Sequence, residues 1–426
     1  MLGSQPYDKR NRNFIMPRTK LVGRLSRPEF ITLVAALIAI NAFAIDVMLP
    51  GLQQIGAGLG EPDANRRQLV IPAYMLGFGL LQMVFGPLSD RYGRRRPLLV
   101  GLCLYCIAAL SAFLVHDFNS LVLLRFLQGA GAAASAVIAM ALIRDLFVGD
   151  EMAKTMSLVF MVLMLSPIFA PGFGQLLLIV MDWRGLFMFM AGLGILVTLW
   201  VWWRLPETLK PEHRRPVGFK SFIDGFGIVF SNHVSLTYIL ATALLFGSLM
   251  GFLTSSQQIY TSTYGVGLWF PAFFAAGGVA AAIGGFINSQ LVTKYGMRRI
   301  SHAALLGFIA ATGTMLVFGW LHFLPLGLFF ALSAVTFFNF SMIMPNFGAL
   351  ALEPLGEVAG TAASAQGVLQ MVIGAALGGF IGQQFDGTAL PLALGMLSLS
   401  LGAMVLVNLK RAKAVPALAA TGESDL

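Results

Sequence analysis

One carboxyl group in this sequence stands inside a long apolar stretch. Asp46 follows an apolar run that begins near Phe30, and a charge at the depth of a bilayer costs about 2.5–3.5 kcal/mol on insertion scales. Removal from water favours the protonated form of a carboxyl group, so such a residue can exchange a proton near neutral pH. Asp46 is therefore predicted to couple proton movement to function. The alternative is that Asp46 lies at the outer edge of its span.

Arg125 is the second charge inside an apolar stretch. It lies about five residues, or about 8 Å of helix, from the outer end of its segment, and Asp46 has a similar depth on a segment that runs the other way. If the two helices face each other, Arg125 holds Asp46 ionised until a proton or a cationic ligand displaces it. The alternative is a structural role, in which Arg125 bonds carbonyl groups of neighbouring helices.

Composition places these residues in a membrane protein. Of 426 residues, 57% are hydrophobic and 11% are charged, and the mean hydropathy is +0.80, which leaves too little polar surface to face water on all sides. We predict an all-α integral membrane protein with twelve transmembrane helices in two pseudo-symmetric six-helix bundles. Each apolar run is long enough to cross a bilayer of about 30 Å, and the runs lie near residues 30–52, 68–88, 98–115, 120–143, 155–180, 185–203, 233–255, 268–290, 300–320, 324–350, 359–382 and 389–409.

The basic residues orient these segments. Four arginines crowd the loop between Gly86 and Pro97, and the positive-inside rule places such a loop in the cytoplasm. In this topology the outer loops hold few basic residues, namely Arg66, Arg67 and Arg184. We therefore expect a multi-pass protein of the inner membrane with both termini cytoplasmic, divided into a basic tail (1–29), an N-terminal bundle (30–203), a cytoplasmic linker (204–232), a C-terminal bundle (233–409) and a tail (410–426).

Several function classes are excluded by what the chain contains. The net charge of +9 sits in short clusters between apolar runs and not on one soluble face, so no nucleic-acid partner is expected. The five histidines are scattered, and phosphate-binding loops, serine elbows and paired metal motifs are missing, so the chain is predicted to be no enzyme and to need no metal or cofactor. Cys103 and Cys106 lie within an apolar run and are interpreted as packing residues.

The two halves of the chain resemble each other. The run from Tyr92 to Arg96 after the second segment is echoed by the run from Tyr295 to Arg299 after the eighth. Parallel six-helix halves are the architecture that a rocking transporter requires. In the second copy Thr293 stands where the first has Asp90, so the role of Asp90 is expected on one side only.

Five segments of the chain carry recognisable motifs, namely Gly86 to Pro97, Leu124 to Gly131, Ser166 to Gly174, Asp46 to Pro50 and Val358 to Ala365. They resemble segments of a known family, the major facilitator superfamily, and within it of the drug:proton antiporters of the Bcr/CflA type. The resemblance covers nearly all of the chain except both tails, although Phe173 and Gln175 flank Gly174 where a paired glycine is often found. The fold, drug export and the lining of a central cavity by the first and fourth spans are what this resemblance implies.

Three further groups of residues receive predicted roles. Asp90, with Arg91, Gly93 and Arg94, is interpreted as a conformational gate, in which Asp90 contacts Arg94 or the start of the eleventh helix near Gly360; the alternative is a solvated turn. The fifth span is expected to be bent by its prolines and glycines, and the alternative is that they only pack there. These residues are Pro167, Pro171, Gly172 and Gly174. Candidates for the substrate-binding wall, each of which can also be a core residue, are Asn41, Tyr238, Phe252, Gln257, Tyr260, Asn339 and Asn346.

These observations predict an antiporter that exports small amphiphilic drugs or metabolites in exchange for protons and that works as a monomer in the lipid bilayer. Substrate and proton would compete for Asp46. One alternative is a proton-coupled importer of a small nutrient, against which the apolar wall argues because polar nutrients need more buried polar partners. Another alternative is a membrane receptor that kept the fold and lost transport.

Overall fold

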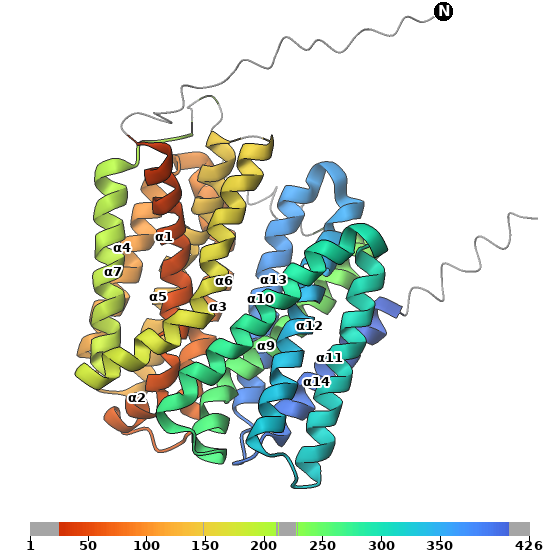
Figure 1. The fold of residues 1–426 in the computed structure, drawn as a ribbon. Coiled ribbons are helices and arrows are strands. Elements are labelled where there is room, and N and C mark those ends of the chain that lie inside the picture. The colour runs from red at the N-terminus through yellow and green to blue at the C-terminus, as the bar shows by residue number, and fades with distance from the viewer. Residues whose placement is uncertain (1–24, 148, 210–211, 213–226, 228, 409–426) are drawn as a thin grey trace, which may run out of the picture.

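The computed structural model describes residues 25–147, 149–209, 212, 227 and 229–408, and its long elements are α-helices (Figure 1). Twelve helices of 19 residues or more occur in this described part of the chain. They are α1 (Arg27–Asp46), α3 (Val70–Tyr92), α4 (Arg95–Leu114), α5 (Phe118–Leu146), α6 (Gly149–Val180), α7 (Trp183–Arg204), α9 (His233–Gln258), α10 (Phe270–Tyr295), α11 (Met297–Trp320), α12 (Leu326–Leu352), α13 (Ala359–Gly382) and α14 (Leu390–Asn408).

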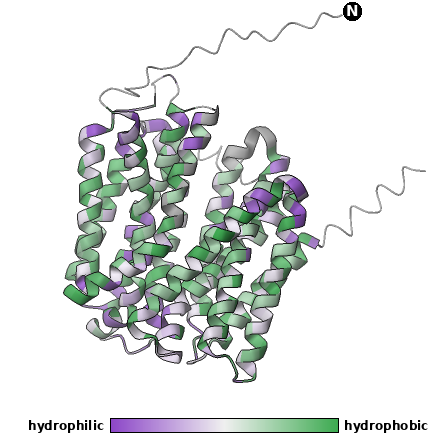
Figure 2. Cartoon of the chain, in the orientation of Figure 1, coloured by the Kyte–Doolittle hydropathy of each residue, from purple (hydrophilic) through white to green (hydrophobic). Residues whose placement is uncertain are grey.

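The helices have the length and composition of membrane spans. Eleven candidate spans are found among the described residues, and α6 contributes a further apolar stretch at Leu165–Val180. Apolar residues dominate the middle of the bundles, and hydrophilic residues gather toward the helix ends (Figure 2). The protein is therefore a multi-pass membrane protein, and its helices are consistent with the twelve predicted spans.

The first predicted span lies within a candidate membrane span, Arg27–Gly58, but it is not one continuous α-helix. The expected segment 30–52 is interrupted after Asp46, the last residue of α1, and continues as a 3-10 turn (Leu49–Gly51) and the short helix α2 (Leu52–Gly58). Pro50 is the reason, because the nitrogen of residue 50 would bond the carbonyl of Asp46 in a continuous helix and proline has no N–H. Asp46 thus lies at a helix end.

Helices α1 to α7 and helices α9 to α14 form two groups, called here the N-terminal and the C-terminal bundle (Figure 1). Small residues let helices of one bundle approach closely. A Cβ atom added at Gly129 of α5 would lie 1.9 Å from the carbonyl oxygen of Tyr74, and one added at Gly77 of α3 would lie 2.0 Å from that of Phe126. The motif from Leu124 to Gly131 in the predicted fourth span therefore packs directly against α3.

The two halves share the turn that the repeated sequence predicts. Gly93 separates α3 from α4 with φ +89°, and Gly296 separates α10 from α11 with φ +81°. Both values lie in the left-handed region that glycine adopts without steric cost. The sequence echo therefore corresponds to the same backbone conformation in each bundle.

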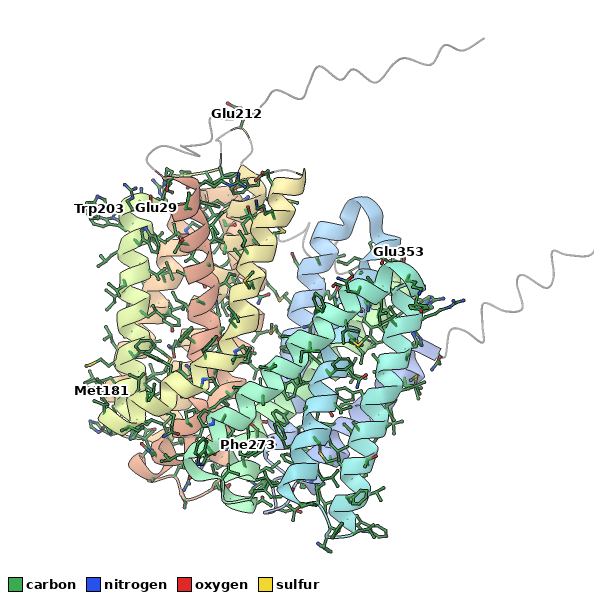
Figure 3. The ribbon with its side chains drawn as sticks, viewed as in Figure 1. Glu29, Met181, Trp203, Glu212, Phe273 and Glu353 are labelled. Atoms are coloured by element: carbon green, nitrogen blue, oxygen red, sulfur yellow. The ribbon has the colours of Figure 1, made fainter. Side chains whose placement is uncertain are left out.

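The two ends of the bundles differ in charge. We call the end that carries Arg94, Arg95, Arg298 and Arg299 the basic end. Figure 3 places Glu29 and Trp203 at this end and Met181 and Phe273 toward the other. Exposed tryptophans occur at both ends, as in the aromatic belts of membrane proteins, with Trp202 and Trp203 at the basic end and Trp269 and Trp320 at the opposite end.

Hydrogen bonds join the two bundles at the end opposite the basic end. The side-chain nitrogen of Asn65 donates to the carbonyl oxygens of Gln383 and Phe385, at 3.0 and 2.9 Å. The amide of Gln53 on α2 donates to the hydroxyl of Thr261 at 2.9 Å. Residues 1–24, most of the expected linker 204–232, and the expected C-terminal tail lie outside the described residues, so the domain boundaries stay predictions.

Candidate functional site

Asp46 is buried where α1 meets α6. Its side chain is 6% exposed, and its Oδ2 atom accepts a hydrogen bond from the hydroxyl of Ser166 on α6, at 3.1 Å. Its surroundings are therefore side chains of the protein. A buried carboxyl group with a neutral donor is therefore the centre of the candidate site.

Arg125 does not pair with Asp46, and this expectation was wrong. Its guanidinium donates to the carbonyl oxygen of Ala44 at 2.8 Å and to the side-chain oxygen of Gln128 at 2.6 Å, and it lies 4.5 Å from the ring centroid of Tyr74. The reason is rotation about α1: consecutive residues turn by about 100°, so Ala44 and Asp46 are on nearly opposite sides of that helix. The arrangement matches the structural role that was the alternative.

A polar network continues from Arg125 into the middle of the N-terminal bundle. The hydroxyl of Tyr74, beneath the guanidinium, donates to the Oδ1 atom of Asn41 at 3.2 Å. The Nδ2 atom of Asn41 donates to the hydroxyl of Ser135 at 2.9 Å. Asn41 is thus bonded to α3 and α5, and the structure gives it partners within its own bundle.

The Pro/Gly motif makes one close contact with α1, at Gly174. A Cβ atom added at Gly174 would lie 2.1 Å from the carbonyl oxygen of Val47, whereas one added at Gly172 would meet no atom within 4 Å. Pro167 and Pro171 lie inside α6, which changes direction along its length (Figure 1). The motif brings α6 against the end of α1, immediately beside Asp46.

The predicted gate residues form an ionic cluster at the basic end. Arg94 bonds Asp90, as one of the two expected contacts, and its Nε atom donates to Asp145 of α5 at 2.8 Å. Glu207, beyond α7, accepts from the backbone nitrogens of Arg94 and Arg95, at 2.7 and 3.2 Å. The carboxylate of Glu207 therefore caps the N-terminus of α4 from another segment.

The remaining gate residues lie around this cluster. The guanidinium of Arg91 lies 5.2 Å from the ring centroid of Tyr92, and Gly93 leaves room for the carboxylate of Glu207, which a Cβ atom would approach to 2.3 Å. Sequence reasoning missed Asp145 and Glu207. The arginine cluster itself could have pointed to them, because clustered positive charges at a helix end favour acidic side chains nearby.

We expect Gly93→Ala to destabilise the protein more than Gly296→Ala. Both glycines have a left-handed backbone, so both substitutions carry the same cost of about 1 kcal/mol or more. Only Gly93 has a neighbour in the way, and displacing Glu207 exposes the α4 N-terminus at a further cost of about 1 kcal/mol. Thermal unfolding of the two variants in detergent measures the difference, and equal losses would show that the Glu207 cap is weak.

The predicted substrate-wall residues of the C-terminal bundle do not converge on one place. Tyr238 and Tyr260 are 22 positions apart along α9 and its π-helical end (Ile259–Thr263), about 33 Å of helix. All six of these side chains pack on or bond residues of their own bundle: Tyr238 on Phe347, Phe252 on Phe337, Tyr260 on Phe329, Asn339 to Val335, Asn346 to Asn288 and Gln257 to Thr261. Their role in substrate binding stays a prediction.

Two bundles of membrane-spanning helices with a repeated turn are an architecture found in secondary transporters. Residues 31–379 match the family model described as the Major Facilitator Superfamily. The chain belongs to this superfamily and is therefore a transporter of small molecules and not an enzyme.

Relatives and solved structures extend the comparison. A bicyclomycin resistance protein homolog of Haemophilus influenzae is 31% identical over 384 residues, which cover 89% of this chain and 94% of the relative. Multidrug resistance protein D of Escherichia coli is 26% identical over 390 residues, with the same coverage of both chains. A D-xylose–proton symporter shares the fold with a TM-score of 0.69 at 14% identity, covering 88% of this chain and 97% of the symporter.

Proposed function

We propose that this protein exports small amphiphilic drugs or metabolites across the inner membrane in exchange for protons, by alternating access of its two bundles. The superfamily fold supports alternating access. The relatives named for bicyclomycin and multidrug resistance support drug export. Protons, an amphiphilic substrate and the bilayer are the partners of a protein that functions as a monomer.

The buried carboxyl group of Asp46 is the observation that carries the proton-coupling part of this proposal. It lies at the C-terminal end of α1, where the helix dipole disfavours a negative charge. Among the described residues it forms no ion pair, and its hydrogen-bond donor is the neutral hydroxyl of Ser166. A proton or a cationic substrate removes the cost of the buried charge, so the two compete for Asp46.

The orientation that goes with this function places the basic end in the cytoplasm, together with both termini. The positive-inside rule supports this orientation, because the basic end holds the arginine loops of both halves. In this orientation the hydrogen bonds between the bundles lie on the outer side. The described conformation is then closed to the outside.

Proton release from proteoliposomes tests the proposal. The full-length protein is reconstituted with a pH-sensitive dye inside the vesicles, and a panel of lipophilic cations and neutral antibiotics is added. At least one compound is expected to elicit proton release with the wild type, and Asp46→Asn is expected to abolish it, because an amide cannot carry the proton. Release that persists in the variant would place proton coupling elsewhere.

Asp182→Asn is the matched control. Asp182 is exposed and caps α7 by accepting from the backbone nitrogen of Arg184. Asparagine caps helices about as well as aspartate, so this variant loses a carboxylate without losing the fold. It is expected to release protons as the wild type does, and a loss in both variants would show a general effect of charge removal.

A further inference from the structure

Ser166 is the residue that connects the carboxyl group of Asp46 to α6. The two side chains are 4% and 6% exposed, and the Ser166 hydroxyl donates to the Oδ2 atom of Asp46 at 3.1 Å. A hydrogen bond to an ionised carboxylate is roughly twice as strong as one between neutral groups. The strength of this link between α1 and α6 therefore changes when Asp46 gains or loses a proton.

The two residues after Ser166 contact the other bundle. A Cβ atom added at Gly278 of α10 would lie 3.0 Å from the Cγ1 atom of Ile168 and 3.6 Å from the Cβ atom of Pro167. Gly278 thus lets α10 lie directly against α6 at this point. The hydroxyl that bonds Asp46 and the side chains that touch the C-terminal bundle belong to three consecutive residues.

A second attachment of α6 to α1 does not depend on protonation. Gly174 packs on the carbonyl oxygen of Val47, the residue that follows Asp46. Between the two attachments lie Pro167 and Pro171, at which a helix lacks backbone hydrogen bonds and bends most easily. One attachment is therefore fixed and the other responds to charge, with a bendable segment between them.

Charged neighbours do not provide an alternative link. The guanidinium of Arg125 on α5 donates hydrogen bonds to Ala44 and Gln128 and not to Asp46. The Tyr74 hydroxyl donates to Asn41. The other described ionisable side chains on the helices packed against α1 lie toward the helix ends: Arg144 and Asp145 on α5, Glu151 and Lys154 on α6, and Arg184 and Arg204 on α7.

We infer that Ser166 is a positioning residue, which holds the Asp46 carboxylate toward α6 and transmits its protonation to the contact between α6 and α10. This inference rests on the proposed function, because it takes Asp46 as the proton carrier. Protonation of Asp46 weakens the bond to Ser166 and releases α6 at its prolines. The C-terminal bundle then changes its position against the N-terminal bundle.

The position of the bundles as a function of pH tests the inference, with the proton itself as the probe. Spin labels are placed at Ala57 on α2 and at Leu321 after α11, which are exposed at the end opposite the basic end, in full-length protein with Cys103 and Cys106 replaced by serine. Pulsed electron resonance gives the distance distribution between pH 5 and pH 9. The wild type is expected to change between two distances with one midpoint.

Ser166→Ala is expected to raise the pH of this midpoint by about one unit, because the lost hydrogen bond favours the ionised carboxylate. The alternative expected result is that the distance change disappears. Ser166→Thr keeps the hydroxyl and is expected to behave as the wild type. Ser166→Cys, a weak donor of similar size, is expected to fall between them and serves if the alanine variant does not fold. Ser400→Ala removes a buried hydroxyl that bonds its own helix and is the control.

The outcomes separate the inference from the proposed function. If Ser166→Ala and Ser400→Ala show the same midpoint and the same distance change, Ser166 is only a packing residue and the inference is wrong. A wild type whose distances do not respond to pH overturns the inference as well. The proposed function is decided separately by the loss or persistence of proton release in Asp46→Asn.

Discussion

Gly174→Ala is expected to remove most of the correctly folded protein from detergent extracts, and Gly172→Ala is expected to leave it unchanged. The first substitution puts a methyl group 2.1 Å from the carbonyl oxygen of Val47. A backbone atom cannot rotate away as a side chain can, so α6 must move off α1. Overpacking of this kind costs about 1–3 kcal/mol and occasionally more.

The comparison with Gly172 isolates the cause of the loss. Both glycines lie in α6, after Pro171, and both substitutions add the same methyl group and the same helix propensity. Around Gly172 the space is open, beside an apolar groove of about 660 Å³ between α1, α6 and α7. Unfolding temperatures and size-exclusion profiles of the two variants measure the difference. Equal stability would show that α6 is not held against Val47.

Asn65→Ala is expected to open the protein at the end opposite the basic end. The Asn65 side chain donates to the carbonyl oxygens of Gln383 and Phe385, and its Oδ1 atom accepts from Gln258 of α9, at 3.3 Å. Each of these hydrogen bonds is worth about 0.5–1.5 kcal/mol. Their joint loss shifts the balance between closed and open forms by about 3 kcal/mol, on the order of 100-fold in the equilibrium constant.

The loop that carries Asn65 is built to present this side chain. The guanidinium of Arg67 bonds the carbonyl oxygen of Glu61, at 3.0 and 2.7 Å, and Arg66 forms an ion pair with the Glu61 carboxylate at 3.0 Å. The backbone nitrogen of Asn65 donates to Asp63 at 2.8 Å. Because these bonds fix the conformation of the loop, Asn65 binds the partner bundle without first being ordered.

Distances between spin labels at Ala57 and Leu321 measure this effect directly. The alanine variant is expected to populate a longer distance than the wild type at the same pH. Asn119→Ala is the matched control, because Asn119 is exposed near the same end and bonds Arg66 within the N-terminal bundle. A distance distribution shared by both variants and the wild type would show that Asn65 is not what closes this end.

Hydrogen bonds of Gln53 and Gln383 remain in Asn65→Ala and limit the shift toward the open form. Gln383 also donates to the backbone oxygen of Asn65 at 2.6 Å, which alanine retains, and Gln53 bonds Thr261 independently. The closed form of Asn65→Ala is therefore weakened and not eliminated. Adding Gln53→Ala is expected to shift the population further in the same direction.

Local properties of the sequence determined the membrane class, the helix segments and the family. About twenty apolar residues suffice to cross a bilayer wherever they occur. The glycine of the tight turn has a similar positive φ in both halves, at Gly93 and Gly296. Asp46 and the Asp90–Arg94 pair were found for the same reason, since a charge in an apolar run and a contact four residues apart need no tertiary information.

Tertiary structure decided which groups meet. Arg125 and Asp46 have similar depths, yet Arg125 bonds Ala44 because helix rotation, which depth does not reveal, sets the direction of each side chain. Ser166, Glu207 and Asn65 bond partners 120, 113 and 318 residues away. Such contacts depend on how helices cross and loops end, so only the packed bundles show that the carboxyl group of Asp46 faces α6.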